Sequence, residues 1–197
     1  DLLNEYINAF EAGAQTYISE VSFSAEMFHR TTINKIEEVN SVYGTNITRS
    51  TPYNVGTDYS SGLEFIILTD PFKFWNLNLS GALYNYRIEG TINGSSFDRE
   101  NFTNNFRVNN SFKITPSFQS QLNFHYFGPS VSSQGRTEPH YSVDVAAKYD
   151  LMDKKLSLTL QVRDLFGTAV REFYSQGTGV YKYEYNQREN PMVMFNI

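Results

Sequence analysis

The residue types that perform nucleophilic, acid–base or metal chemistry are present in this chain, but they are scattered. Its histidines, His29, His125 and His140, show no spacing typical of metal ligands. The sequence contains no cysteine, which excludes thiolate catalysis and cysteine metal sites. We therefore expect no metal and no cofactor.

Acidic residues and serines give no stronger sign of catalysis. Acid–base catalysis needs groups that converge, and neither Asp98-Arg99-Glu100 nor Glu37-Glu38 indicates such convergence. His140 lies two residues before Ser142, but no third partner completes a nucleophilic site. The glycines at 177–179 do not link a strand to a helix, so they predict a hairpin tip and not a nucleotide site. The sequence predicts that the protein is not an enzyme and has no catalytic residues.

The elements that would position these residues are β-strands, because apolar and polar residues alternate along most of the chain. Leu156, Leu158, Leu160 and Val162, for example, alternate with polar residues. The predicted fold is all-β, an antiparallel up-and-down meander of about nine strands. Strands are expected near 5–18, 21–40, 54–69, 74–89, 103–115, 117–128, 139–151, 154–175 and 180–197.

Connections between these strands alternate between short and long. Short turns are expected at 19–20, 70–73, 116–117 and 152–154, and long polar loops at 43–54, 89–103, 128–139 and 167–187. Aromatic residues gather near strand ends, as at Tyr17, Phe72, Phe74 and Trp75. This rhythm and these aromatic girdles are typical of a transmembrane β-barrel of the outer membrane.

The two faces of the predicted strands differ in chemistry. We expect Leu156, Leu158, Leu160 and Val162 to share a lipid-facing side with Val143, Val145 and Ala147 of the neighbouring strand. The opposite, lumen-facing side is expected to carry the polar residues Glu64, Arg107, Lys148 and Arg163. A soluble antiparallel sheet would also place such charges in water, and it is the alternative to a barrel.

Composition narrows the range of partners. The 197 residues carry a net charge of -5 and no cluster of basic residues, which argues against a nucleic-acid partner. Apolar runs fall far short of the roughly 20 residues that a transmembrane helix needs. Outer-membrane lipid is therefore the expected surrounding of a barrel.

Three stretches resemble the C-terminal half of TonB-dependent outer-membrane receptors, in particular the branch described as outer-membrane β-barrel family proteins. They are Asn4–Gly13, the pair Tyr53–Gly56 and Ser61–Glu64, and Gln161–Gly167. The resemblance covers essentially the whole chain in the right order, although each motif is short.

The resemblance implies a barrel of roughly 22 strands with a plugged lumen. Such a receptor lies in the outer membrane of a Gram-negative bacterium and actively takes up a nutrient such as a siderophore, cobalamin or an oligosaccharide. Its partners would be outer-membrane lipid, the N-terminal half of the same barrel with its plug, and an inner-membrane energy-coupling protein. Family members usually continue a few residues further, to an aromatic residue, whereas this sequence ends at Phe195-Asn196-Ile197.

Strand number leads to a related expectation. Single-chain bacterial barrels have an even number of strands, and nine is odd. We therefore expect residues 1–197 to form a single segment, the last nine strands of a larger barrel, with the plug domain absent. Its edge strands would then be open to a partner strand.

Tyr174, Tyr181, Tyr183 and Tyr185 flank the glycines at 177–179. They would either brace a hairpin beyond the membrane or form an aromatic platform that contacts a ligand, such as a sugar or a siderophore, at the barrel mouth. Two other functions stay open: a complete small barrel with an adhesion or structural role, and an outer-membrane barrel enzyme.

Overall fold

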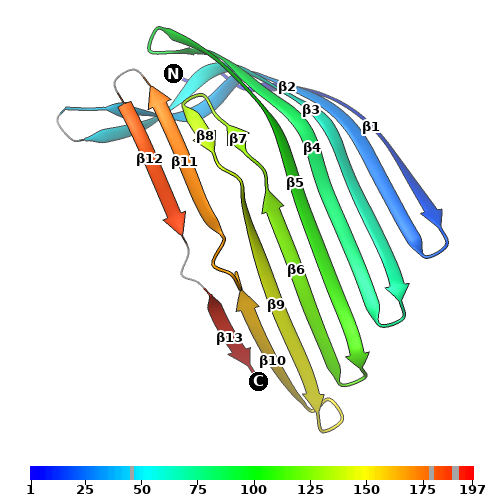
Figure 1. Cartoon of the computed structure of the whole chain (residues 1–197). Helices are drawn as coiled ribbons and strands as arrows, with labels where there is room; N and C mark the ends of the chain where they lie inside the picture. The colour runs from blue at the N-terminus through cyan, green and yellow to red at the C-terminus, as the bar shows by residue number, and fades with distance from the viewer. Residues whose placement is uncertain (45–46, 178–179, 188–190) are drawn as a thin grey trace.

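The computed structural model describes residues 1–44, 47–177, 180–187 and 191–197, and within these ranges the regular structure is β-strand (Figure 1). A helix of the length and apolar character needed to span a bilayer is not found there. The strands are β1 (Tyr6–Ile18), β2 (Val21–Val42), β3 (Thr48–Phe72), β4 (Trp75–Ile92), β5 (Ser95–Thr115), β6 (Phe118–Phe127), β7 (Ser130–Val131), β8 (Gly135–Thr137), β9 (His140–Leu151), β10 (Leu156–Arg163), β11 (Val170–Gly177), β12 (Val180–Gln187) and β13 (Met192–Asn196).

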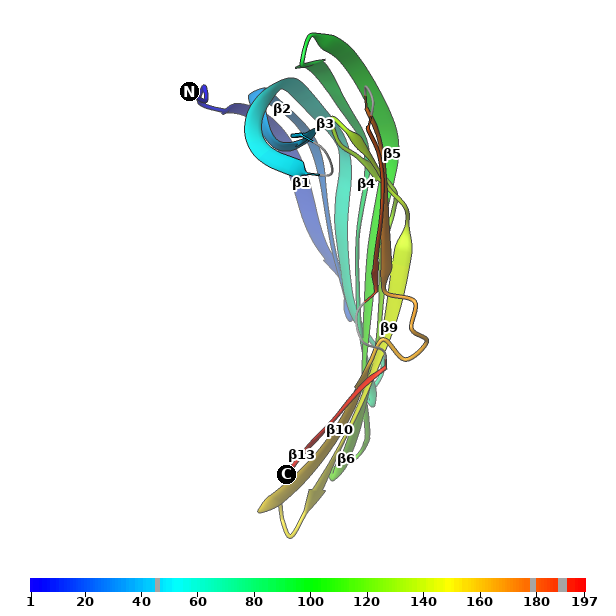
Figure 2. The ribbon, with the colours of Figure 1, turned by 90° about the vertical axis from the view of Figure 1, so that its left-hand side faces the viewer.

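Among the described residues, nine strands form one antiparallel sheet in the order β1-β2-β3-β4-β5-β6-β9-β10-β13. This confirms the predicted all-β meander. Four other strands of the described chain form a second sheet in the order β12-β11-β8-β7. Figure 2 shows that the large sheet is an open, curved wall with a concave and a convex side. Tight turns at residues 19–20, 73–74, 116–117 and 152–155 join the strands at its lower end (Figure 1).

The predicted loops at 43–54 and 89–103 are wrong in kind, because both regions are mostly strand. β2 continues to Val42 and β3 begins at Thr48, while β4 and β5 are joined at Asn93-Gly94. Asn93 and Gly94 have φ of 51° and 80°, as the tight hairpin turn requires. These regions are polar because their strands extend beyond the apolar part of the wall. They are nevertheless paired with neighbouring strands.

The predicted single strands 154–175 and 180–197 are also wrong, since each is divided between the two sheets. β10 ends at Arg163, and the next residue, Asp164, has a φ of 48°. The Asp164 carboxylate accepts hydrogen bonds from the backbone N–H groups of Thr168 and Ala169, at 2.9 and 3.0 Å. This turn sends β11 and β12 into the second sheet, and β13 then returns to pair with β10. The predicted loop 128–139 likewise contains the β7–β8 hairpin.

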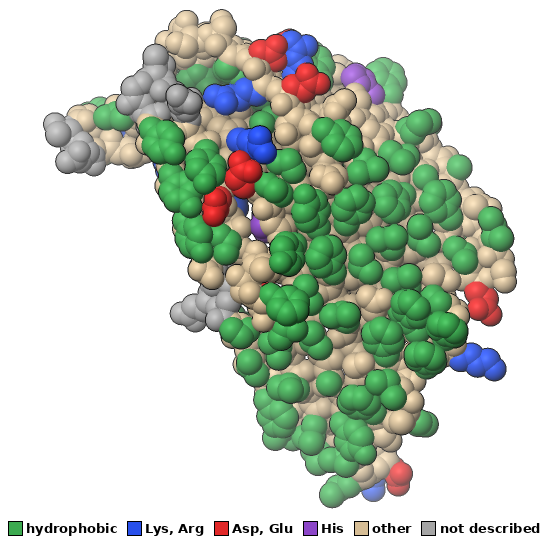
Figure 3. Space-filling model, viewed as in Figure 1, with side chains coloured by type: hydrophobic (Ala, Val, Ile, Leu, Met, Phe, Trp, Pro, Cys, Tyr) green, Lys and Arg blue, Asp and Glu red, His purple; other side chains and the backbone are tan. Residues whose placement is uncertain are grey.

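The faces of the wall follow the alternation of the sequence. In the register of β9 and β10, Leu160 lies opposite Ala147 and Val162 opposite Val145, which confirms that these residues share one face. Figure 3 shows hydrophobic side chains covering the convex side, with charged groups towards the upper and lower ends. We call the hydrophobic part of this convex surface the apolar band.

A small hydrophobic core lies at the upper end of the wall, where the extended β2–β3 hairpin crosses β4. Val39, Val55 and Ile88 form a buried cluster there. The crossing requires glycine at two facing positions, Gly56 and Gly90. A Cβ atom on Gly90 would lie 1.8 Å from the Val55 carbonyl oxygen, and Gly56 has a φ of 147°. These glycines therefore allow two backbones to approach closely enough to bury the cluster.

Candidate functional site on the concave face

An irregularity in β2 turns its upper half inwards. The register between β2 and β3 shifts between Ile33, Lys35 and Ile36, and Asn34, at the shift, has a φ of 57°. Bulges of this kind bend a strand and redirect its side chains. Figure 2 shows the resulting β2–β3 extension curled over the concave side of the wall.

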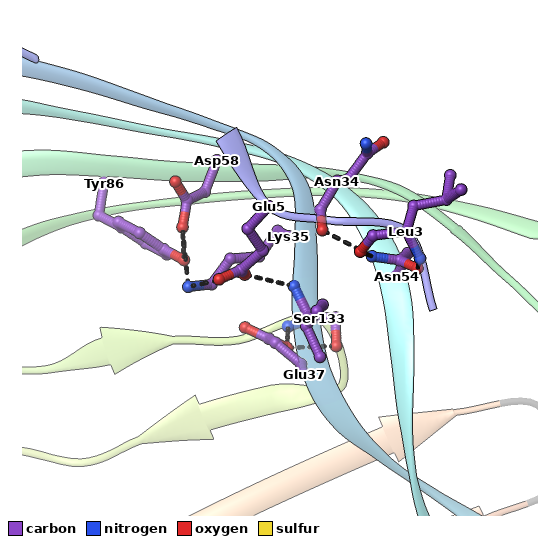
Figure 4. A network of polar contacts seen from close by, with 10 residues as sticks. Leu3, Glu5, Asn34, Lys35, Glu37, Asn54, Asp58, Tyr86 and Ser133 are labelled. Atoms are coloured by element: carbon purple, nitrogen blue, oxygen red, sulfur yellow. Dashed lines mark hydrogen bonds and ion pairs between the residues drawn. The ribbon is translucent and has the colours of Figure 1, made fainter. Parts of the chain in front are cut away.

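The segment before β1 is tied to this bend by side chains (Figure 4). Asn54 donates to the Leu3 carbonyl at 3.0 Å and accepts from the Leu3 N–H at 2.8 Å. The Glu5 carboxylate accepts from the Ile36 N–H at 2.6 Å and lies 3.7 Å from the Lys35 ammonium. Residues 3–5 therefore help to hold the bend in place.

A polar chain centred on buried Asp58 lies under the bend (Figure 4). The Lys35 ammonium is 3.7 Å from the carboxylate of buried Asp58, and Asp58 accepts a hydrogen bond of 3.0 Å from the Tyr86 hydroxyl. Burial, followed by the neighbouring charge of Asp58, raises the pKa of Tyr86 well above its usual value. Tyr86 therefore stays neutral and acts as a hydrogen-bond donor to Asp58.

The β7–β8 hairpin closes the site from the other side. Its tip meets the extension of β2, where the Ser133 N–H donates to the Glu37 carboxylate at 2.9 Å (Figure 4). Gln134 accepts from the Asn40 N–H at 2.7 Å and donates to the Asn40 carbonyl at 2.9 Å. These contacts join segments 94 or more residues apart in the chain. They clasp the two hairpins together above the concave wall.

Below this clasp lies an open depression of about 410 Å³. Its lining comes from the five neighbouring strands β1–β5 and combines charged, hydroxyl and aromatic side chains. Arg30 is 2.7 Å from Glu11 and 3.8 Å from Glu64, and its guanidinium lies 4.5 Å from the ring centre of Phe28. The depression is lined by Ile7, Phe28, Arg30, Thr32, Asp58, Ser60, Glu64, Ala82, Tyr84, Tyr86 and Asn105. Such a surface can hold a polar ligand through hydrogen bonds and ring contacts.

The four polar residues expected in the lumen occupy different levels of the wall. Glu64 lines the depression and, together with Arg107 and His125, a neighbouring hollow of about 370 Å³. Lys148 lies lower, 3.0 Å from the carboxylate of Asp150. Arg163 is at the upper end of β10, opposite Met192. The structure therefore brings Glu64 and Arg107 together and leaves the other two apart.

The other singled-out residues lie apart from the depression. His29 is 2.7 Å from the Ser61 hydroxyl, and the His140 ring stacks on Phe127 with centres 5.0 Å apart. Asp98 pairs with Arg87 at 2.7 Å, and Glu38 accepts a hydrogen bond from Ser50. In the described part of the chain, no group of three or more such side chains could hold a metal ion.

The four tyrosines share one face of the β11–β12 hairpin. Tyr174 pairs with Tyr183, and Tyr181 and Tyr185 lie two residues before and after Tyr183 on β12. The rings of Tyr174 and Tyr183 are 4.9 Å apart. A hydrogen bond to Glu172 raises the pKa of Tyr174 to about 12. The expected tip of this hairpin, Gly177-Thr178-Gly179, includes residues 178–179, which lie outside the described residues.

Sequence reasoning missed Lys35, Asp58 and Tyr86, which form the polar chain under the bend. Asp58 lies in a polar stretch of the predicted third strand, and a carboxylate at mid-strand was a usable signal. The role of Ser133 was not readable from the sequence, because its partner Glu37 is 96 residues away.

Comparison with known proteins places this geometry in a wider group. The model of the outer membrane protein beta-barrel family matches residues 1–197. No curated protein matches the sequence significantly. In fold, the chain is similar to the siderophore receptor PiuA from Acinetobacter baumannii, with a TM-score of 0.63 and 14% sequence identity. The similarity covers 92% of this chain and 27% of the receptor chain, so the segment spans about a quarter of that receptor's length. The chain therefore belongs to the outer membrane protein beta-barrel family, and it lies in the outer membrane with its apolar band in contact with lipid.

Proposed function

We propose that this chain is a wall segment of an energy-coupled, TonB-dependent receptor that takes up a nutrient such as a siderophore, cobalamin or an oligosaccharide. The observation that carries the proposal is the inward fold of the β2–β3 extension, clasped to the β7–β8 hairpin above a polar depression. The clasped hairpins partly cover the concave side above a surface suited to a polar ligand. The receptor-like fold supports the same role.

The proposed role also defines partners. The edges of the curved sheet, β1 and β13, would pair with the N-terminal half of the same barrel, whose plug would fill the concave side. An inner-membrane energy-coupling protein would act on that plug. The role needs no reaction on the ligand, so we propose that the segment is not an enzyme. The charged groups of the depression would serve binding, and pairs such as Arg30–Glu11 would fix their geometry.

Uptake by cells tests this function. The full-length protein that contains residues 1–197 would be produced in a strain lacking its own receptors and offered labelled ferric siderophores, cobalamin and oligosaccharides in turn. We expect saturable uptake of one class, abolished by a protonophore or by deletion of the energy-coupling protein. Uptake that survives both treatments would indicate a passive pore, and no uptake of any class would favour an adhesion or structural role.

A matched pair of arginine variants tests the depression itself. Arg30 and Arg87 each lie 2.7 Å from a carboxylate, but Arg30 lines the concave depression and Arg87 lies on the convex side. We expect Arg30→Gln to raise the KM of uptake several-fold and Arg87→Gln to leave it unchanged. Equal effects of the two variants on KM would show that the ligand does not contact the depression.

A further inference from the structure

The convex surface continues upwards beyond the apolar band. Leu63 and Leu83 form one of the highest apolar pairs on β3 and β4, and the next outward pair, Ser61 and Asn85, is polar. Since outward side chains recur every second residue, this pair lies about 7 Å above the leucines. Exposed Phe102 lies opposite Asn85 at this level, and aromatic side chains of this kind gather where hydrocarbon gives way to lipid headgroups. Side chains higher on this side therefore face the headgroup layer of the outer leaflet.

An open depression of about 220 Å³ lies at this level. It is lined by Tyr59, Ser61, Asn85, Arg87 and Glu100. The guanidinium of Arg87 is already neutralised, because it lies 2.7 Å from both Glu89 and Asp98. The lining therefore offers hydroxyl, amide, carboxylate and ring surfaces, but no spare positive charge from Arg87.

The tyrosines of β11 and β12 lie on the same side of the molecule. Figure 3 shows hydrophobic side chains gathered over these two strands, on the side that carries the apolar band. The opposite face of the hairpin carries Ser175, which is buried and donates to the Gln134 carbonyl, and Gln134 in turn bonds to the β2 extension on the concave side. The exposed tyrosines therefore lie on the convex side of the hairpin. We call Tyr174, Tyr181, Tyr183 and Tyr185 the tyrosine face; their exposed fractions run from 37% to 72%. It points away from the concave depression.

Charge indicates which part of a lipid this surface fits. Arg136 and Glu138 lie beside the tyrosine face in the register of β8 and β11, and Glu172 lies within it. Together with the lining of the outward depression and its ion-pair partners, these residues provide five carboxylates and two guanidinium groups. An excess of carboxylates repels phosphate, whereas tyrosine rings, amides and carboxylates suit the rings and hydroxyls of sugars.

We propose that the tyrosine face and the Tyr59–Glu100 depression bind the saccharide part of a glycolipid of the outer leaflet. The surface is continuous with the lipid-facing band, so a lipid anchored beside the wall reaches it without leaving the membrane. The occupant is thus a neighbouring membrane lipid, distinct from the nutrient proposed for the concave side.

Glycolipid retention by the full-length receptor tests this assignment. The protein would be placed in nanodiscs of phospholipid alone or of phospholipid with a diglucosyl diacylglycerol, whose sugars carry no charge, then delipidated in steps and weighed by native mass spectrometry. The test variant is Tyr181→Ala with Tyr183→Ala, and its matched control is Lys182→Ala with Glu184→Ala, which alters the opposite face of the same strand. Asn85→Ala tests the depression.

We expect wild-type protein and the control to retain the glycolipid, and the tyrosine variant to retain it at least about threefold less. Asn85→Ala should also lower retention. The detached oligosaccharide should compete with the glycolipid at high concentration, because the sugar makes the contacts. If the double alanine variant does not assemble, Tyr181→Phe with Tyr183→Phe replaces it and should give a smaller loss. Retention equal to wild type in the assembled tyrosine variant would overturn the proposal. A receptor dimer formed through this face in phospholipid alone would also overturn it, because a second copy of the protein would then be the occupant.

Discussion

The lower wall and the upper cap of this molecule are built differently. In the lower wall, paired strands expose apolar side chains on one face and polar ones on the other, and few side chains bury each other. In the upper cap, formed by the β2–β3 extension, the tops of β4 and β5 and the β7–β8 hairpin, side chains pack together. Of the four buried hydrophobic residues in the described ranges, Val39, Val55 and Ile88 lie in the cap, and the fourth is Phe28.

This contrast reflects the surroundings of each part. Lipid covers the apolar band, so the lower wall needs no core of its own, and its strands are held by hydrogen bonds that a bilayer makes obligatory. The cap lies above the apolar band among water and polar headgroups, where exposed apolar groups are unfavourable and free backbone groups have polar partners. It therefore has a small core, an N-terminal tie and a clasp. The cap should be more sensitive to core and turn mutations than the wall below it.

The largest effect is expected from Gly90→Val. A Cβ atom at this position meets the Val55 carbonyl at 1.8 Å, and the backbone there cannot move aside without separating β3 from β4. The β2–β3 extension should become accessible to protease, while the lower wall still forms. Limited proteolysis of the full-length protein measures this. Gly94→Asn is the control, because its Cβ meets nothing within 4 Å and asparagine tolerates a φ of 80°. Equal resistance of both variants would contradict the described crossing.

A smaller effect is expected from Ile88→Ala. Ile88 is fully buried, so truncation should destabilise the cap by about 2–5 kcal/mol through lost contacts and a cavity. Hydrogen exchange of residues 48–55 should speed up accordingly. Ile66→Ala is the control, because Ile66 lies on the concave face with 46% of its surface exposed. If Ile66→Ala accelerates exchange at residues 48–55 as much as Ile88→Ala does, the cap has no core of its own.

High pH should weaken the cap through Tyr86. Its pKa is raised in the folded protein, so the neutral phenol contributes stability below its unfolded pKa of about 10, and this contribution is lost as pH rises further. Hydrogen exchange in the cap should therefore accelerate above that pH in wild type. Tyr86→Phe should remove this pH-dependent step, and it should cost about 1 kcal/mol at neutral pH through the lost bond to Asp58. A step that persists in Tyr86→Phe would assign it to another group.

The smallest effect is expected from Asp98→Asn. The hydrogen bond from Arg87 lowers the pKa of Asp98, so the pair contributes at neutral pH and loses its contribution as pH falls through the folded pKa. Both groups are well exposed, and salt screens such pairs. Hydrogen exchange of the β4–β5 hairpin should change little, and the small difference should vanish at high salt. A large change that resists salt would show that the hairpin depends on this pair.

Sequence reasoning succeeded for the wall and failed for the cap. The faces of β9 and β10 followed from alternation, because residues two positions apart on a strand, such as Leu160 and Val162, always lie on the same face of the sheet. The same reasoning divided the upper hairpins wrongly, since residues 43–54 and 89–103 looked like loops. It also joined residues 154–175 into one strand, although the Asp164 turn separates two sheets. The placement of Glu64 in a depression together with Arg30 depended on strand order and curvature.

The sequence by itself determined the strand class, the tight turns and the side on which most wall residues lie, because each depends on neighbours within a few residues. Only the tertiary structure decided where the strands bend and what the bends bury. The shift at Asn34 and the Gly56–Gly90 crossing depend on contacts between separate strands. The Glu37–Ser133 contact joins residues 96 positions apart, and no local pattern encodes that distance. The curvature of the sheet brings these residues together, and so it creates the concave site.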